Sequence, residues 1–127
     1  MSDFLDLLCV AIIADIMPMT SLNFTMVKHG LKKIKTSKRP AFIELNEIMR
    51  KERFISDDIG FLIAPKINSA GRMEDASTAL KFLLSTNTYD AQDGLYALND
   101  LNDYRKHFKN KLAVKQWQKL MKRIQLL

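Results

Sequence analysis

The stretch that decides the fold is the apolar run at residues 4–14, FLDLLCVAIIA. This run of 11 residues is too short to cross a bilayer, which takes about 20 apolar residues in a helix. It also lacks the basic flank of an export signal and contains Asp6. Because the run is apolar on every side, we expect a covered core element at residues 3–14. Its length favours a helix, although residues 10–13 are also compatible with a strand. A start this apolar indicates that the chain begins inside a larger fold.

Composition points to a globular protein with an acidic partner. The 127 residues fit one small domain, 47% of them are hydrophobic, and only 4 Gly and 3 Pro are present. Twenty Lys and Arg against fourteen Asp and Glu leave a net charge of +6, which favours nucleic acid or a membrane surface without deciding between them. The single Cys9 excludes an intramolecular disulfide framework and a Cys-rich zinc site. It fits a reducing cytoplasm, so we expect a cytoplasmic protein without a membrane segment.

Working outward from this run, the sequence predicts further helices. Residues 23–34 carry a helical stripe of Leu22, Met26, Val27, Leu31 and Ile34. Pro40 suits the first turn of another helix, whose inward residues would be Phe42, Leu45, Ile48 and Met49. Ser56 to Asp58 is a helix start, and a short helix should end near Leu84.

The C-terminal third predicts one long helix. Residues 89–127 contain no Pro and only Gly94, after a polar tract at residues 85–88 that has capping chemistry. Apolar residues recur at helical spacing, with a register jump between Leu112 and Trp117: Leu95, Leu98, Leu101, Tyr104, Phe108, Leu112, Trp117, Leu120, Ile124 and Leu127. We therefore predict a mainly α fold, with a helical part at residues 1–87 followed by a long helix at residues 88–127.

Charge is distributed in blocks along the chain. Residues 28–53 hold nine basic side chains and three acids, and residues 74–103 hold six acids and one Lys. Residues 105–127 hold eight basic side chains and no acid. Such blocks are usually solvated helix faces. An acid-free helix can also bind a phosphate backbone, or it can belong to a surface whose partner is missing.

Asp15 is the first candidate for a functional residue. It follows an apolar run, where an ionised carboxylate is costly to bury unless a cation or hydrogen-bond donors compensate it. Mg²⁺ and Mn²⁺ prefer carboxylate oxygen, so Asp15 is a candidate metal ligand. The alternative is a helix-terminal Asp bonded to backbone amides. His29 and His107 are isolated in sequence and are not expected to be ligands.

The second candidate is the segment at residues 65–72, PKINSAGR, which we expect to form a loop. Small side chains at Ser69 and Gly71 would let a phosphate approach the backbone amides. Arg72 would then grip the phosphate with two hydrogen bonds, and Lys66 would add a point charge. The alternative is a helix-ending turn with Gly71 left-handed and Arg72 in solvent. The segment is neither a P-loop nor a nucleophile elbow.

Three motifs in order resemble the RecJ family, single-strand-specific DNA exonucleases of the DHH phosphoesterase superfamily. Residues 6–19, DLLCVAIIADIMPM, resemble the family's DLVALGTVADVVPL stretch, and Asn23, Val27, Gly30 and Leu31 resemble its ENRxLVxxGL continuation. Residues 60–73, GFLIAPKINSAGRM, are similar to GFxLGPRINAAGRL. Residues 89–105 resemble ALxLNxLNxxR, the opening of a long connecting helix. The similarity covers residues 3–110 and a minor part of a full-length RecJ.

The resemblance implies a role for each candidate. Asp15 would be the last carboxylate ligand of a two-metal site that uses Mn²⁺ or Mg²⁺, whose other ligands lie in upstream motifs absent from this chain. The segment with Lys66, Asn68, Ser69, Gly71 and Arg72 would line the groove beside a single DNA strand. Two residues depart from the family pattern: Phe24 stands where Arg is usual, and Lys66 replaces an Arg and so loses bidentate geometry. The tail at residues 111–127 matches no pattern of the family.

We therefore interpret the chain as a segment of a 5′ to 3′ single-stranded-DNA exonuclease of DNA repair and recombination. It would hold the end of the catalytic domain and the start of a connecting helix, and it should be inactive alone. The alternatives are another DHH phosphodiesterase acting on nucleotides or short oligonucleotides, and a non-catalytic basic module that binds nucleic acid or protein. In a whole RecJ-like enzyme an upstream α/β layer would cover residues 4–14, and the final helix would also have a partner. Without these, we expect both apolar faces to be exposed in this chain. The long helix would then fold back over residues 4–14 or, preferably, pair with a second copy.

Overall fold

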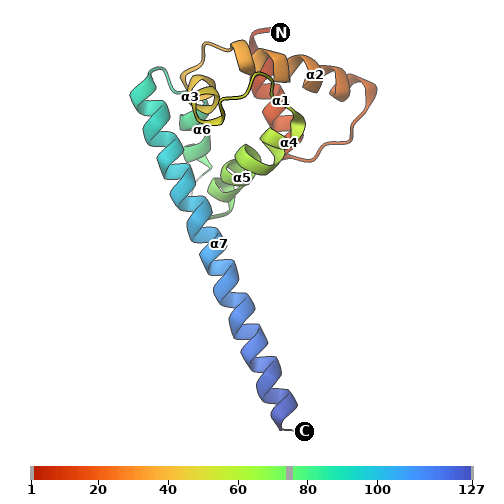
Figure 1. The fold of residues 1–127 in the computed structure, drawn as a ribbon, viewed down its shortest axis with the longest axis vertical. Helices are drawn as coiled ribbons and strands as arrows, with labels where there is room; N and C mark the ends of the chain where they lie inside the picture. Colours follow the sequence, from red (N-terminus) through yellow and green to blue (C-terminus); the bar gives the residue numbers. More distant parts are fainter. Residues whose placement is uncertain (1, 74–75, 127) are drawn as a thin grey trace.

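The computed structural model describes residues 2–73 and 76–126, so Leu127 lies outside the described residues. Within them a 3-10 turn, η1 (Ser2–Phe4), leads into α1 (Leu5–Ala14), followed by α2 (Ser21–Thr36) and α3 (Pro40–Met49). The next helical run joins α4 (Ser56–Asp58), a π-helical turn η2 (Ile59–Ile63) and α5 (Ala64–Met73). Then come α6 (Ser77–Leu83) and α7 (Thr88–Gln125). The described part contains helices and no strand, which confirms the mainly α prediction (Figure 1).

Helix α1 is the centre of a compact head, as its apolar sequence predicts. Cys9, Val10 and Ile12 are buried, and α1 packs against α2, η2 and α5. The helical alternative for residues 3–14 is thus confirmed over the strand. The expectation that this element needs an absent layer to cover it is wrong for these residues, because helices of the chain itself cover them.

The contact between α1 and α2 depends on Gly30. A Cβ atom at this position would lie 2.3 Å from the Cys9 Cβ atom and 2.6 Å from the Leu5 carbonyl oxygen, so no side chain fits. The Cys9 thiol is buried in the same contact between α1 and α2. Burial, with a smaller contribution from the Asp6 charge, raises the pKa of this thiol to about 12.

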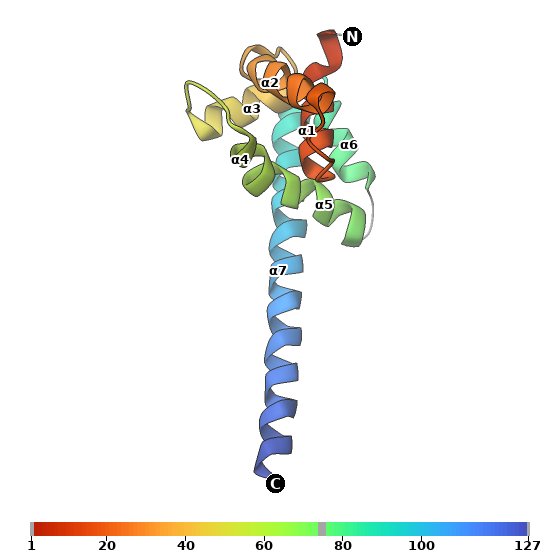
Figure 2. The ribbon, with the colours of Figure 1, turned by 90° about the vertical axis from the view of Figure 1, so that its right-hand side faces the viewer.

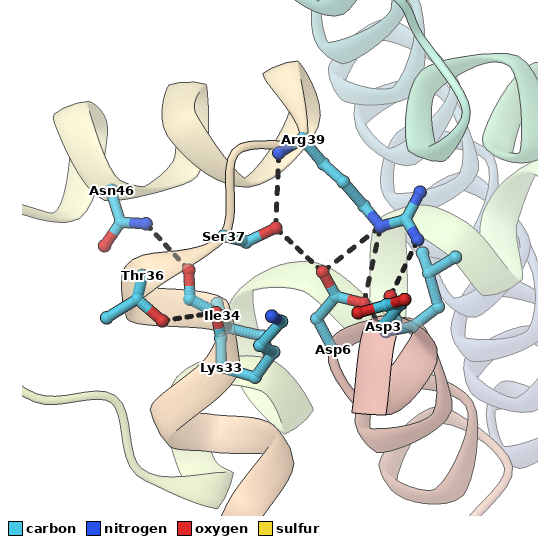
Figure 3. A network of polar contacts seen from close by, with 9 residues as sticks. Asp3, Asp6, Lys33, Ile34, Thr36, Ser37, Arg39 and Asn46 are labelled. Carbon is cyan, nitrogen blue, oxygen red and sulfur yellow. Dashed lines mark hydrogen bonds and ion pairs between the residues drawn. The ribbon is translucent and has the colours of Figure 1, made fainter. Parts of the chain in front are cut away.

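A buried polar network fixes the start of α1 to the connection between α2 and α3 (Figure 3). Asp6 is 1% exposed and accepts hydrogen bonds from the Ser37 hydroxyl at 2.7 Å and from Arg39 Nε at 3.2 Å. Arg39 also donates to the Asp3 carbonyl oxygen at 2.9 Å and lies over the Phe4 ring, 5.4 Å from its centroid. The sequence interpretation treated Asp6 only as an argument against an export signal and missed this role.

The first half of helix α7 packs against the head, and its second half extends into solvent. Its buried residues are Ala91, Leu95, Leu98 and Asn102, and it packs on α3, α5 and α6. Every side chain from 106 to 126 is exposed, and the helix runs away from the head in both views (Figures 1 and 2). The expectation that this helix folds back over residues 4–14 is therefore wrong.

In α2 and α3, two residues of the expected apolar stripes face solvent instead. Leu22 is 63% and Ile48 is 62% exposed, because α2 and α3 each pack on the head along a narrower face than the sequence pattern indicates. No helix among the described residues combines the length and the apolar character needed to cross a membrane.

We expect Gly30→Ala to destabilise the head by about 1–3 kcal/mol, because the new methyl group meets backbone at Leu5 and forces α1 and α2 apart. The matched control is Gly71→Ala, since an added Cβ there meets no atom within 4 Å. Gly71 is helical, so this control should be neutral or stabilise by up to about 1 kcal/mol. Urea unfolding of both variants measures the difference, and equal stabilities would contradict the close contact.

Arg39→Met should cost about 3 kcal/mol, because it leaves the Asp6 carboxylate buried without its cation. Lys38→Met, which removes an exposed neighbouring charge, should change the free energy of unfolding by less than about 0.5 kcal/mol. In a double-mutant cycle, the variant that carries both Asp6→Asn and Arg39→Met should lose much less free energy of unfolding than the sum of the losses in the two single variants. Strict additivity in thermal or urea unfolding would contradict the coupling.

Candidate functional site

The segment at residues 65–72 is helical, so the expectation of a phosphate-binding loop is wrong. It forms most of α5, and no Gly among the described residues has a positive φ. The π-helical turn η2 directly precedes it, and there the Ala64 N–H donates to the Ile59 carbonyl oxygen. The wider turn makes room where the Pro65 ring would otherwise clash with the preceding turn. The backbone amides of α5 are consequently engaged within the helix rather than free for an anion.

The start of this helical run is anchored by Asp58. Its carboxylate accepts a hydrogen bond from the Ile55 N–H at 2.9 Å and pairs with the Lys51 ammonium group. Burial alone would raise the pKa of the Asp58 carboxyl, but these two partners hold that pKa below its usual value. The stabilisation is therefore present above the usual pKa of an Asp and is lost as the pH falls through the lowered value.

Ser69 faces the interior of the protein. It is fully buried, and its hydroxyl faces two acceptors, the Pro65 carbonyl oxygen at 2.6 Å and Asn102 Oδ1 on α7 at 3.1 Å, which share its one proton. Asn102 is also buried. The expected phosphate contact by Ser69 is not supported by this position. Instead, Ser69 and Asn102 fix α5 on the long helix, a pairing that the sequence interpretation missed.

The turn that carries Asp15 is held at both ends by asparagine side chains. Asn68 on α5 donates from Nδ2 to the Ala14 carbonyl oxygen at 3.2 Å. Asn23 on α2 donates from Nδ2 to the Pro18 carbonyl oxygen at 2.8 Å. Both asparagines belong to the sequence motifs singled out above. Residues far apart in the chain thus meet at one place.

Asp15 itself lies exposed at the end of α1. Its backbone N–H donates to the Ala11 carbonyl oxygen at 3.0 Å, and the next residue, Ile16, is left-handed with φ 51°. Within the described residues no hydrogen bond or ion pair engages the Asp15 carboxylate, so neither burial nor amide capping of this side chain is observed. Its oxygens are available to a cation.

The donor set for a metal is incomplete in the described part of the chain. No three His, Cys, Asp or Glu residues cluster there in a way that could hold an ion. His29 and His107 are both exposed and stand apart, in α2 and in the free half of α7. Asp15 therefore fits one ligand position for an oxygen-preferring cation and does not by itself make a site.

The remaining candidates lie along α5. Asn68, Gly71 and Arg72 are exposed, and Lys66 is half-buried. Space around Gly71 is open. Asn68 and Arg72 lie one turn apart on the same side of α5, whereas helical spacing places Lys66 on another side. The side with Asn68 can present one guanidinium and one amide to an anionic strand that approaches the Asp15 turn.

Comparison with known proteins finds that the chain is similar to one segment of larger proteins, which are single-stranded-DNA-specific exonucleases. No family model matches the chain. Its curated relatives are named RecJ: the Haemophilus influenzae protein is 34% identical over 108 residues, which are 83% of this chain and 19% of that protein. The Escherichia coli K12 protein is 28% identical over 117 residues, covering 90% of this chain and 20% of that protein.

Solved RecJ structures agree with the sequence comparison. A RecJ exonuclease bound to manganese matches with a TM-score of 0.81 and 32% identity, covering 90% of this chain and 29% of that one. RecJ from Thermus thermophilus in complex with Mg²⁺ matches with a TM-score of 0.80 and 31% identity, covering 90% of this chain and 18% of that one. The chain is therefore a relative of one segment of RecJ, and it spans about a fifth of the length of the curated relatives that it matches.

We expect Asn68→Ala to loosen the Asp15 turn without unfolding the head. Its lost bond to Ala14 lies at the surface, so the free energy of unfolding should fall by no more than about 1 kcal/mol. Amide hydrogen exchange at residues 15–17 should become several-fold faster. Lys66→Ala, earlier on α5, should leave exchange at these amides unchanged. Equally faster exchange in both variants would contradict the role of the Asn68 hydrogen bond in holding this turn.

Proposed function

We propose that this chain is the part of a RecJ-like single-stranded-DNA exonuclease that presents one metal-binding carboxylate beside a DNA-contacting helix. The observation that carries the proposal is the hydrogen bond from Asn68 to the Ala14 carbonyl oxygen. It joins two of the motifs singled out in the sequence, across a separation of 54 residues. The carboxylate of Asp15 and the polar face of α5 are thereby held next to each other.

Asp15 would serve as one oxygen ligand of Mn²⁺ or Mg²⁺, the ions bound in the RecJ structures. In a two-metal phosphodiesterase of the DHH type, such ions activate water and stabilise the leaving oxygen. This chain would contribute the position of one carboxylate, in a turn whose two ends are held by hydrogen bonds from Asn68 and Asn23. The further ligands must come from outside the described residues.

The exposed face of α5 would hold the DNA backbone. Arg72 can donate two parallel hydrogen bonds to a phosphate, whereas Lys66 acts as a point charge. Asn68 and the open surface at Gly71 allow close approach of the strand. Ser69 takes no direct part in this proposal, because its hydroxyl is used to attach α5 to α7. A 5′ to 3′ polarity and a place in DNA repair and recombination in the cytoplasm complete the proposed function.

We expect the isolated chain to bind single-stranded DNA weakly and to leave it intact when Mn²⁺ is added, because two-metal hydrolysis needs several ligands that hold ions about 4 Å apart. A labelled oligonucleotide serves both for anisotropy and for a gel assay. Lys66→Gln with Arg72→Gln should raise Kd several-fold more than Lys38→Gln with Lys81→Gln, which removes the same charge elsewhere.

Two results would contradict these expectations. Equal losses in the two double variants would show that binding is non-specific and would remove α5 from the proposal. Degradation of DNA by the pure chain that Asp15→Asn abolishes would show that the chain alone completes a metal site.

A further inference from the structure

A groove lies between α2 and the connection from α3 to α4. It is lined by side chains between Phe24 and Lys32 on α2, by residues 53–56 and by Met19 in the turn before α2. Its volume of about 530 Å³ lies within the range of small ligand pockets, about 300–1,000 Å³. None of the candidate residues on α5 lines it, so the groove is a separate feature of the head.

The groove has an apolar floor and an exposed aromatic side chain. Val27 and Phe54 are buried, 6% and 3% exposed, whereas Phe24 is 59% and Met19 is 54% exposed. Phe24 is thus a large ring beside a hollow, with much of its surface in contact with water. Such a ring gains free energy when a flat apolar group covers it. Phe24 also stands where the RecJ pattern has Arg, so this ring is a property of this chain.

The rim of the groove is positively charged. Lys28 and Lys32 follow Phe24 at four-residue spacing along α2, and Arg53 comes from the connection to α4. These three cations are exposed, and within the described chain no hydrogen bond or ion pair engages them. No acid is among the described residues that line the groove. The groove is therefore complementary to a ligand that combines negative charge with flat apolar groups.

One end of the groove adjoins the turn that carries Asp15. Met19 lines the groove and lies four residues after Asp15 in the same connection between α1 and α2. Asn23, the neighbour of Phe24, holds this connection by donating from Nδ2 to the Pro18 carbonyl oxygen at 2.8 Å. A strand that follows the groove along α2 toward Phe24 therefore approaches the Asp15 turn.

We propose that this groove binds single-stranded DNA, with one base stacked on Phe24 and the following phosphates paired with Lys28 and Lys32. The proposal rests on the proposed function, because the position of the groove beside the Asp15 turn is what favours DNA over an acidic peptide. Proteins that bind a single strand without sequence preference combine the same two elements, an aromatic surface for bases and a cationic groove for the backbone. The bases of a duplex are stacked on one another and do not reach the Phe24 ring. The groove thereby favours single-stranded over double-stranded DNA.

Fluorescence anisotropy with the full 127-residue chain tests the stacking. The probes are a labelled oligothymidylate and a strand of the same length that has the phosphates and no bases. Phe24→Ala should raise Kd for oligothymidylate about fivefold or more and leave Kd for the abasic strand unchanged, because only the stacked base is lost. Phe24→Tyr keeps a ring and should bind as the unmodified chain does. The matched control Tyr96→Ala, which removes a ring that is 68% exposed on α7, should change neither Kd.

The salt dependence of binding tests the cations. Lys28→Gln with Lys32→Gln should raise Kd for both strands and lower the slope of log K against log salt by about 1.4, since each phosphate contact to a single strand contributes about 0.7. Lys38→Gln with Lys81→Gln removes the same charge away from the groove and should alter the slope by less. For a duplex of the same length, Phe24→Ala should leave Kd unchanged.

Three results would overturn the proposal. The first is equal affinity of the Phe24→Ala and Tyr96→Ala variants for oligothymidylate, or an equal loss for both strands in the Phe24→Ala variant. The second is an unmodified chain that binds no oligothymidylate at low salt. The third is binding of a peptide of Glu and Phe residues that the groove substitutions weaken while binding of DNA is unaffected, which would assign the groove to a protein partner.

The variants of Lys66 and Arg72 on α5 separate this proposal from the proposed function. If only those variants weaken binding of oligothymidylate, the groove proposal fails and the α5 surface stands. If only the groove variants weaken it, the groove stands and α5 is removed from the proposed function.

Discussion

The hydrogen-bonded ion pair between Asp6 and Arg39 is the constraint on which the rest of the head depends. Helix α1 is the central element, yet it carries a carboxylate that is almost completely buried. Such a charge is tolerated only where donors surround it, and Ser37, Arg39 and the Leu7 N–H supply them. The connection from α2 to α3 must therefore pass over the start of α1, which fixes how α2 packs along α1 at Gly30.

The position of α1 then determines the geometry of the candidate site. The turn with Asp15 follows the C-terminus of α1, and Asn68 on α5 donates a hydrogen bond to the start of that turn. On the next residue of α5, Ser69 bonds to Asn102 of α7. Two neighbouring side chains on one helix thus connect the carboxylate turn to the long helix.

Local sequence patterns predicted the helices well, because apolar periodicity and capping residues act over a few positions. The core role of residues 4–14 and the long helix from residue 88 followed from such patterns. The helical state of residues 65–72 did not, because Pro65 and Gly71 are breakers by propensity and only the π-helical turn and the buried Ser69 override them. The sequence also indicated Asp15 and Asn68 separately. Their proximity depends on packing across 54 residues, which no local pattern contains.

The free half of α7 poses a different physical problem. Residues 106–126 are exposed throughout in the described chain, so their helix is supported by propensity and by continuity with the half that packs on the head. Isolated helices of this length are marginal in water, and clustered cations repel one another along the rod. Trp117, Leu120 and Ile124 are exposed on this half of the helix, and covering them would supply the missing stabilisation. The helical state beyond Arg105 therefore depends on whether these apolar side chains are covered.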